Sequence, residues 1–527
     1  MTERTMSDAW AGTLLVARHA LHRDRLLVGV WTTLLVLVVY ASAAATGSLY
    51  ETTVEQVRAA QAINTNPAVV ALYGPILDEH SLGELAMTKV TVLYAVILAL
   101  MFVVVVGRHT RGEEESGYAE LLGGTAISRD VLLAAALVEG VVLSIAVGLL
   151  AALADIAGGL PVAGSLGFGA TWVGTGLVAV ALTAVAGQLS ASSRTCFGIA
   201  GAALAALYLM RAVGDVDAEW LSWLTPFGWN TRFSAWSEPR WWVLLLYVAL
   251  AGFLAVAAQA LRARRDLGAG LFPARPGPAH GSPRLSDVLA LTWRVHRPAL
   301  VGWTVGVAAM GTVLGAIAPG VGDLLDTDAG RRLIESIGGV GALEDALVAA
   351  VLSVSAVVIT CFGLAVLTRG SADEHDGRTE QVLATATSRT RSLAAALVVA
   401  LGGVAWLLAV AGLATGVGLG HDIGGLIEAG LAQLPAVWLV LGLAALLYAV
   451  RSSWAVVGWG LLGLFFVLGQ LGGLLDLPGW VTGLSPYAHT SAVPVETFSA
   501  TPALGLTALA AVCLVAAWWR YRSRDIG

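Results

Sequence analysis

The sequence predicts an all-α polytopic membrane protein with about twelve transmembrane helices, arranged as two parallel six-helix repeats. Three observations predict this fold class. First, 57% of the 527 residues are hydrophobic and only 13% are charged, whereas soluble domains carry roughly 25% charged residues. Second, apolar runs of roughly 20 residues, the length that crosses the hydrocarbon core as a helix, recur along the whole chain. Third, a shift of about 260 residues brings unusual segments of the two halves into register without gaps.

The apolar runs are predicted to be helices because they are continuous and lack the period-two alternation of barrel strands. On the length criterion they lie near residues 26–46, 88–107, 131–154, 168–190, 196–213, 241–261, 298–319, 343–367, 393–416, 427–449, 453–473 and 500–519. Because the first run is too long for a signal-peptide core, we expect an uncleaved membrane anchor.

Charges between the runs predict the orientation. Arginines gather before the first run, after the sixth and after the twelfth, so by the positive-inside rule these segments and both termini are expected to be cytoplasmic. They are Arg4, Arg18, Arg23, Arg25, Arg262, Arg264, Arg265, Arg275, Arg284, Arg520, Arg522 and Arg524. Carboxylates gather in the loops after the first and seventh runs, which are expected outside: Glu51, Glu55, Asp78, Glu79, Glu84, Asp323, Asp326, Asp328 and Glu335.

The domain organisation follows from this count. Six spans per half is an even number, so the halves are predicted to be parallel repeats about an axis normal to the membrane, able to enclose a shared path. We expect the first repeat over 1–265, a cytoplasmic Gly/Pro/Arg linker over 266–283 with the boundary near Pro278, and the second repeat over 284–527.

The most specific repeated segment lies between the second and third spans of each half. Gly112–Arg129 meets Ala372–Arg389, and residues of the same type coincide at seven positions. In the first copy these are Glu114, Gly117, Glu120, Thr125, Ala126, Ser128 and Arg129, and in the second Glu374, Gly377, Glu380, Thr385, Ala386, Ser388 and Arg389. The same shift pairs Ser192 and Ser193 with Ser452 and Ser453.

These acidic segments are predicted to be docking helices for a cytoplasmic partner. In a helix, Glu113 and Glu120 share a face, as do Asp373 and Glu380, and an intervening glycine allows close approach of another surface. The alternative is a solvated loop, but duplication at a fixed offset favours docking. The predicted docking residues are Glu113, Glu114, Gly117, Glu120, Asp373, Glu374, Gly377 and Glu380.

A second repeated motif, W-x-x-x-L-[ST]-P-[FY], lies between the fifth and sixth spans of each half, on the expected outer side. One interpretation is an aromatic interfacial belt. The prolines favour a second interpretation. In it, the motif forms short re-entrant or interfacial helices that break at proline and close the outer end of the pathway. The predicted gate residues are Trp220, Pro226, Phe227, Trp480, Pro486 and Tyr487.

Ionisable residues within the spans are few, which disfavours a proton-coupled carrier. Glu139 lies inside the third span and Asp155 at its outer end, while the repeat places Val399 and Thr415 at those positions. Since intramembrane charges are costly and usually functional, Glu139 is interpreted as a buried hydrogen-bonded group in preference to a ligand in the substrate path. Basic amphipathic stretches precede the first and seventh spans and predict either surface helices or flanking positive-inside signals.

No catalytic or metal-binding pattern is found. The lone lysine, Lys89, follows Thr88, so the chain lacks the G-x-x-x-x-G-K-[ST] pattern whose lysine binds nucleotide phosphates. It also lacks G-x-S-x-G, H-E-x-x-H and a Cys/His cluster at metal-ligand spacing. We expect no enzymatic activity and no cofactor in this chain, and any ATP hydrolysis must take place in another subunit.

The sequence resembles permease subunits of the ABC-2 type, in particular the fused twelve-span permeases of polyketide antibiotic or tetronasin-like exporters of high-GC bacteria. The resemblance rests on an EExxGxxELLxxTxxSR-like segment that begins at Glu113, and it covers nearly the whole chain. The second copy departs from it at Asp373, His375, Gln381 and Val382. The resemblance implies that the segment is a coupling helix, that one chain assembles with two copies of a separate ATPase carrying ATP and Mg²⁺, and that alternating access exports hydrophobic or amphipathic compounds.

Two other functions stay open. A proton-coupled secondary efflux carrier with six plus six spans also repeats a motif after its second span, although that loop is typically basic. A membrane scaffold or sensor subunit is the third possibility. All three place the chain in a bacterial cytoplasmic membrane with the lipid bilayer as a partner, and none involves nucleic acid.

Overall fold

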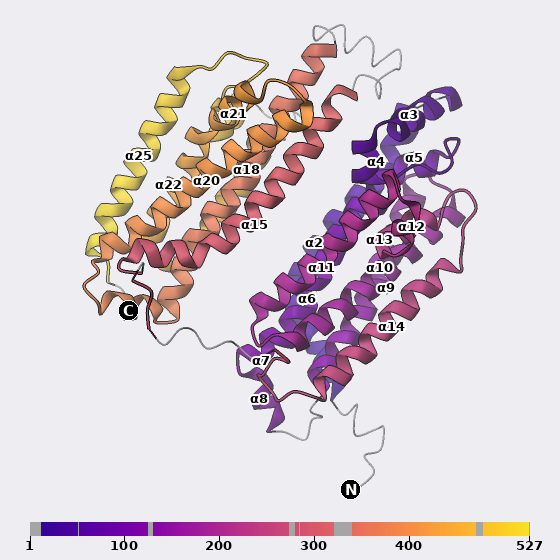
Figure 1. Cartoon of the computed structure of the whole chain (residues 1–527), viewed down its shortest axis with the longest axis horizontal. Coiled ribbons are helices and arrows are strands. Elements are labelled where there is room, and N and C mark those ends of the chain that lie inside the picture. Colours follow the sequence, from indigo (N-terminus) through magenta and orange to yellow (C-terminus); the bar gives the residue numbers. More distant parts are fainter. Residues whose placement is uncertain are drawn as a thin grey trace. The chain divides into compact units, whose positions relative to one another are not determined.

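The computed structural model describes residues 12–50, 52–124, 130–272, 280–283, 285–320, 340–470 and 478–525. Every regular element within these ranges is helical, and twelve helices are long and apolar enough to cross a membrane. This confirms the predicted all-α, multi-pass membrane fold. The chain divides into two compact units, residues 1–277 and 278–527, and each is described by itself below (Figure 1).

Six candidate spans belong to the first unit. They are α2 (Thr13–Leu49), the continuous run from α5 (Leu82–Lys89) through η1 (Val90–Tyr94), α6 (Ala95–Gly107), η2 (Arg108–Gly112) and α7 (Glu113–Glu115), then α9 (Val131–Ala157), α10 (Val162–Leu189), α11 (Ser193–Val216) and α14 (Val243–Arg262). Four short helices, α3 (Thr53–Thr65), α4 (Pro67–Tyr73), α12 (Glu219–Trp223) and α13 (Pro226–Arg232), lie at one end of the bundle, and α8 (Tyr118–Gly123) lies at the other (Figure 1).

The second unit also contains six candidate spans. They are α15 (Val288–Ile317), α18 (Val340–His375), α20 (Arg389–Leu419), α21 (Ile423–Leu431) with α22 (Leu434–Val450), η4 (Ser452–Val456) with α23 (Val457–Gln470), and α25 (Ala500–Ser523). The short elements are η3 (Ala318–Gly320), α19 (Arg378–Leu383), α24 (Gly479–Thr482) and η5 (Pro486–His489).

Glycines allow the closest helix contacts in both units. A Cβ atom added at Gly148 of α9 would lie 2.5 Å from the carbonyl oxygen of Gly169 in α10, and one at Gly315 of α15 would lie 2.2 Å from that of Thr415 in α20. Since lipid tails are as apolar as leucine, helices in a membrane associate mainly through such close packing. Each unit has its own apolar core.

The predicted amphipathic stretches are not separate surface helices. The described part of the first one, from Thr13 onward, is continuous with the span in the 37-residue helix α2. At 1.5 Å per residue this helix is about 55 Å long, whereas the hydrocarbon core is about 30 Å thick, so its basic first turns extend beyond the membrane. The second stretch likewise continues into α15, which contains Pro298 without ending there.

The predicted linker begins with an ordered part. The backbone amides of Leu271 and Phe272 donate to the carbonyl oxygens of Gln188 and Leu189, both at 3.0 Å. Residues 266–272 therefore fold back on the end of α10. Residues 273–279 and 284 lie outside the described residues, as do the predicted outer carboxylates between 321 and 339.

Candidate functional site

Each acidic segment consists of two helices separated by a turn, not one helix. α7 ends at Glu115, and Gly117 has a φ of +79° before α8 begins. In the second unit α18 ends at His375, and Gly377 has a φ of +70° before α19 begins. Left-handed backbone favours glycine, which lacks a Cβ atom. The expectation that Glu113 shares a helix face with Glu120, and Asp373 with Glu380, is therefore wrong.

The two glycines serve this turn and not the approach of another described part of the chain, because a Cβ atom at Gly117 or Gly377 would meet no atom of the described residues within 4 Å. The short helices after them match under the shift of the repeat: α8 covers Tyr118–Gly123 and α19 covers Arg378–Leu383. Residues 125–129, which complete the repeated motif in the first copy, lie outside the described residues.

Glu113 and Glu114 point into the first unit. The Glu113 carboxylate accepts a hydrogen bond of 2.5 Å from Arg23 of α2. Glu114 accepts from Arg265, which follows α14, at 2.6 and 2.7 Å, and from Arg111 at 2.7 Å. Two hydrogen bonds between one guanidinium and one carboxylate form a strong, oriented pair. These two carboxylates therefore join α7 to α2, the first span of this unit, and to the segment that follows α14, its sixth span.

Glu374 occupies the same position in the second unit and has the same kind of partner. Its carboxylate pairs with Arg524, which follows α25, and accepts hydrogen bonds from the hydroxyls of Tyr448 at 2.5 Å and Tyr521 at 2.9 Å. Asp373 accepts a hydrogen bond of 2.8 Å from Arg378. Of the predicted docking carboxylates, Glu113, Glu114 and Glu374 are thus held internally.

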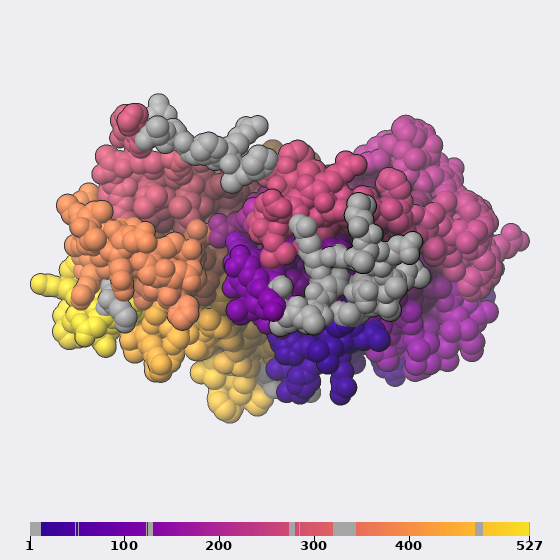
Figure 2. Space-filling view, turned by 90° about the horizontal axis from the view of Figure 1, so that it is seen from below, coloured from indigo at the N-terminus to yellow at the C-terminus, as the bar shows by residue number. Residues whose placement is uncertain are grey.

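The side chains left on the surface belong to α8 and α19. Glu120 and Glu380 are exposed, and Leu121 is 75% exposed although it lies beyond the end of the span. Figure 2, which views the molecule from the α8 end of the first unit, shows the purple atoms of this segment on the surface. An exposed carboxylate beside an exposed apolar side chain suits contact with another protein.

The repeated serines contact these segments as well. The Glu115 carboxylate accepts a hydrogen bond of 3.0 Å from the backbone amide of Ser193, at the beginning of α11. In the second unit, Ser371 donates to the carbonyl oxygen of Ser452 at 2.8 Å. The acidic segment is therefore tied to the beginning of the fifth span in both units.

The W-x-x-x-L-[ST]-P-[FY] motif of the first unit forms α12 and α13, with the break just before Pro226. Trp220 is 65% exposed, as expected of an interfacial tryptophan, while Pro226 and Phe227 are buried. Thr225 caps α13 by accepting a hydrogen bond of 3.0 Å from the amide of Gly228. The motif thus combines one exposed aromatic residue with a buried anchor.

Asn230 connects α13 to three other elements. Its amide group donates to the carbonyl oxygen of Thr91 in η1 at 3.0 Å, and its oxygen accepts from Thr175 of α10 at 3.0 Å and from Tyr247 of α14. Tyr247 is fully buried. The sequence motif ends before Asn230, so sequence reasoning missed this residue.

The second copy of the motif also combines an exposed tryptophan with buried residues. Trp480 in α24 is 76% exposed, whereas Pro486 and Tyr487 of η5 are buried. The hydroxyls of Tyr487 and Thr360 of α18 share a hydrogen bond of 2.7 Å. Burial raises the pKa of the Tyr487 hydroxyl, so it remains neutral.

Comparison with known proteins decides the family. The chain is 37% identical to "Multidrug efflux system permease protein Rv1217c" of Mycobacterium tuberculosis (strain ATCC 25618 / H37Rv), over 98% of this chain and 96% of that protein. The chain belongs to this family of multidrug efflux permeases. Residues 285–522 also match the family "Multidrug efflux system permease Rv1217c, C-terminal domain".

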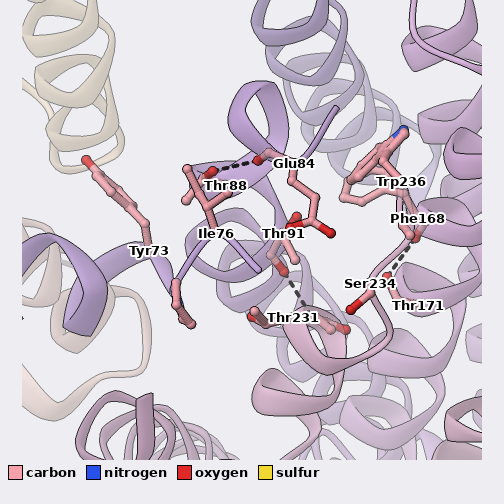
Figure 3. Close-up of a pocket in the computed structure, with 13 residues that line it drawn as sticks. Tyr73, Ile76, Glu84, Thr88, Thr91, Phe168, Thr171, Thr231, Ser234 and Trp236 are labelled. Carbon is pink, nitrogen blue, oxygen red and sulfur yellow. Dashed lines mark hydrogen bonds between the residues drawn. The ribbon is translucent and has the colours of Figure 1, made fainter. Parts of the chain in front are cut away.

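In the first unit of the permease, a small pocket with a cavity volume of about 30 Å³ lies at the end opposite α8. Figure 3 shows Phe168 and Trp236 on one side of it and Tyr73 on the other. The lining also includes Glu84 and several hydroxyl-bearing residues, namely Thr88, Thr91, Thr171, Thr231 and Ser234. The pocket is therefore mixed in character and adjoins the predicted gate segment.

The second unit of the permease carries two apolar grooves along α15. One, with a cavity volume of about 610 Å³, is lined by α15 and α18 and includes Trp303 and Met310. The other, with a cavity volume of about 680 Å³, is lined by α15 and α20 and includes Trp293 and Trp406. Sequence reasoning did not single out these residues, because tryptophans in spans resemble ordinary apolar residues in a hydropathy pattern.

Glu139 is fully buried in α9 and lies beside His109, with 3.9 Å between Oε2 and Nε2. Neither of its oxygens makes a hydrogen bond with a described residue. The predicted burial of Glu139 is therefore confirmed, whereas the predicted hydrogen bond is not present among the described residues. The grooves and the mixed pocket do not include it among their lining residues.

Proposed function

We propose that this permease is the membrane-spanning subunit of an ATP-driven ABC-2 type exporter in a bacterial cytoplasmic membrane, with both termini cytoplasmic. It would move hydrophobic or amphipathic compounds, such as drugs, antibiotics or lipids, out of the cell. ATP and Mg²⁺ would bind in a separate ATPase, two copies of which would dock on one permease chain. The Mycobacterium tuberculosis relative is named as a multidrug efflux system permease.

The observation that carries the proposal is the repeated construction of the acidic segments. In each unit a short exposed helix follows a left-handed glycine, and the preceding carboxylate pairs with an arginine at the end of the last span. Two copies of such a helix provide two docking positions, one for each ATPase subunit. Glu120 and Leu121 of α8, and Glu380 of α19, would make the contact.

The internal ion pairs give this docking a mechanical consequence. A displacement of α8 would pull on α7, because only a short turn separates them, and α7 is held to α2 through Arg23 and to the end of α14 through Arg265. ATP would favour the state in which its binding subunits are closed, because it binds that state more tightly. The docked helices would transmit this preference to the spans and change access to the path.

The apolar grooves along α15 support a hydrophobic cargo. Their lining includes Trp293, Trp303 and Trp406 and contains no charged residue. Such surfaces bind ligands through removal of apolar area from water and not through fixed ionic contacts. This suits a family whose relative is named for multidrug efflux.

Reconstitution tests the proposal against a proton-coupled carrier. The permease should co-purify with a chain carrying a Walker A lysine, and a hydrophobic drug should stimulate ATP hydrolysis in proteoliposomes of the pair. Drug uptake into inverted vesicles should need ATP and persist after the proton gradient is dissipated. Uptake by the permease alone, driven by a proton gradient, would establish the carrier instead.

A further inference from the structure

A cluster of three buried side chains lies within the first unit, between α2, η2 and α9. Asp24 and Glu139 are fully buried, and His109 is 5% exposed. One oxygen of each carboxylate and a ring nitrogen of His109 all lie within 4.8 Å of one another. His109 Nε2 is 3.0 Å from Asp24 Oδ2 and 3.9 Å from Glu139 Oε2.

One carboxylate of this cluster, that of Glu139, is not offset by an arginine of the described residues. Asp24 lies 3.0 Å from Arg108 Nη1, which offsets one negative charge, and Glu113 is paired with Arg23. Glu139 makes no ion pair with a described arginine; its nearest basic group is His109 at 3.9 Å, and neither of its oxygens makes a hydrogen bond with a described residue. A buried carboxylate without partners is strongly unfavourable.

One proton on His109 or Glu139 would balance the charge, but it would leave hydrogen-bonding groups of the cluster unsatisfied. Protonated His109 would donate from Nε2 to Asp24 at 3.0 Å, which leaves Glu139 at 3.9 Å without a hydrogen bond. If Glu139 carried the proton, its hydroxyl would have no described acceptor within hydrogen-bond distance. A single ion between the three groups satisfies all of them together.

We propose that Asp24, His109 and Glu139 bind one divalent transition-metal cation of the Zn²⁺ class. Zinc lies about 2.0–2.2 Å from nitrogen and oxygen ligands, so tetrahedral ligand atoms are about 3.4 Å apart. The 3.0 and 3.9 Å separations lie on either side of that value. Imidazole with two carboxylates is a ligand set for zinc and its neighbours, whereas Mg²⁺ and Ca²⁺ prefer oxygen ligands alone.

The surroundings of His109 fit this role. Its other ring nitrogen, Nδ1, faces the Glu113 carboxylate at 3.7 Å, which resembles the carboxylate that commonly orients a metal-binding histidine. Arg108 opposes a cation, but it lies next to Asp24 Oδ1 and leaves Oδ2 for the metal. A small pocket lined by His19, Arg23, His109 and Glu113 adjoins the ring and offers a route of access.

The site joins α2, η2 and α9 at the same place where Glu113 binds Arg23, so the ion would rigidify the segment that leads to α8. The second half of the chain does not contain the equivalent three ligands. The shift that pairs His22 with His296 places Pro298 opposite Asp24, and the shift of about 260 residues places Arg369 and Val399 opposite His109 and Glu139. The permease should therefore bind one ion per chain and not two.

Metal analysis of the purified full chain tests the site. The protein, with its affinity tag removed, is stripped with a chelator, incubated with Zn²⁺ and desalted, and its zinc is measured by mass spectrometry. Wild type should retain about one zinc per chain, and His109→Asn and Glu139→Gln should retain almost none. Asp155→Asn is the matched control, because it removes another fully buried carboxylate of α9 outside the cluster and should retain zinc like wild type.

Two measurements keep the result interpretable if a variant folds poorly. Size-exclusion profiles and helical circular dichroism identify misfolded variants. Cobalt added to stripped wild type should give the visible absorption of a low-symmetry four-coordinate ion, and this needs no variant. The proposal is overturned if folded wild type retains no zinc, or if it and folded Glu139→Gln retain equal amounts; either result would assign the cluster to a protonated histidine among carboxylates.

Discussion

The Glu114 carboxylate accepts two hydrogen bonds from the Arg265 guanidinium, at 2.6 and 2.7 Å, across 151 residues of the chain. Glu374 pairs with Arg524 across 150 residues in the second unit. The carboxylates coincide under the shift of the repeat, whereas Arg524 stands one residue before the counterpart of Arg265. The contact is thus retained although its second partner is displaced by one position, since a long arginine side chain can absorb that difference.

Removing the charge of Glu114 should destabilise the first unit. Glu114→Gln leaves Arg265 and Arg111 without their carboxylate in a largely buried place, and breaking a buried ion pair typically costs about 3–5 kcal/mol. Thermal unfolding of the permease in detergent should show a clearly lower midpoint. Glu120→Gln is the control because Glu120 is exposed, and an equal loss of stability in both variants would contradict the assignment.

Reversing the charge of the exposed carboxylates should affect assembly and not folding. Glu120→Arg with Glu380→Arg should reduce co-purification of the ATPase and drug-stimulated ATP hydrolysis at least tenfold, about 1.4 kcal/mol of docking energy. Thermal stability should stay within about 0.5 kcal/mol of wild type. Glu238→Arg, at an exposed site following α13, is the matched charge-reversal control. Unchanged co-purification and drug-stimulated ATP hydrolysis in the double variant would count against the docking surface.

Replacing Gly117 should strain the turn between α7 and α8. A Cβ atom there meets no neighbour among the described residues, so the expected effect is conformational, and left-handed backbone costs an alanine about 1–2 kcal/mol. Gly117→Ala should lower stability by roughly that amount, and Gly117→Asn by less. Gly29→Ala, at an open position inside α2, should be neutral or slightly stabilising; the same response at both sites would argue against a conformational cause.

Truncating Asn230 should loosen the predicted gate segment of the first unit. Asn230→Ala removes the hydrogen bonds to Thr91, Thr175 and Tyr247, and each buried group left unsatisfied costs about 1–3 kcal/mol. Proteolysis or hydrogen exchange should report increased opening of residues 219–232. Thr490→Ala, at the counterpart position in the second unit, should have little effect; equal protection of residues 219–232 in wild type and Asn230→Ala would refute the role of Asn230.

The membrane fold could be predicted from the local sequence pattern, because a membrane-spanning helix requires only sufficient length and apolarity. Both properties can be read from consecutive residues. The twelve candidate spans overlap the twelve predicted runs. The same reasoning failed at Gly117, where a seven-residue spacing indicated a shared face but the backbone turns. Helical periodicity applies only while the helix continues, and a glycine can end it.

The sequence also did not predict which charged side chains are buried. Glu113, Glu114 and Glu120 look alike in the printed sequence, yet two point inward to arginines and one faces outward. In the sequence, Arg265 and Arg524 indicate only the expected cytoplasmic side. Their role as partners depends on where the end of the sixth span lies relative to the second, and no local pattern specifies that position.

The sequence by itself determined a twelve-span helical membrane protein with a motif repeated in each half, since hydropathy and self-similarity are properties of the chain. Only the tertiary structure decided which carboxylates are buried in ion pairs, which remain available to another protein, and that Asp24, His109 and Glu139 meet. These three residues are far apart in the sequence on three different helices. Their proximity arises from the packing of those helices, which depends on many weak contacts spread over the whole unit.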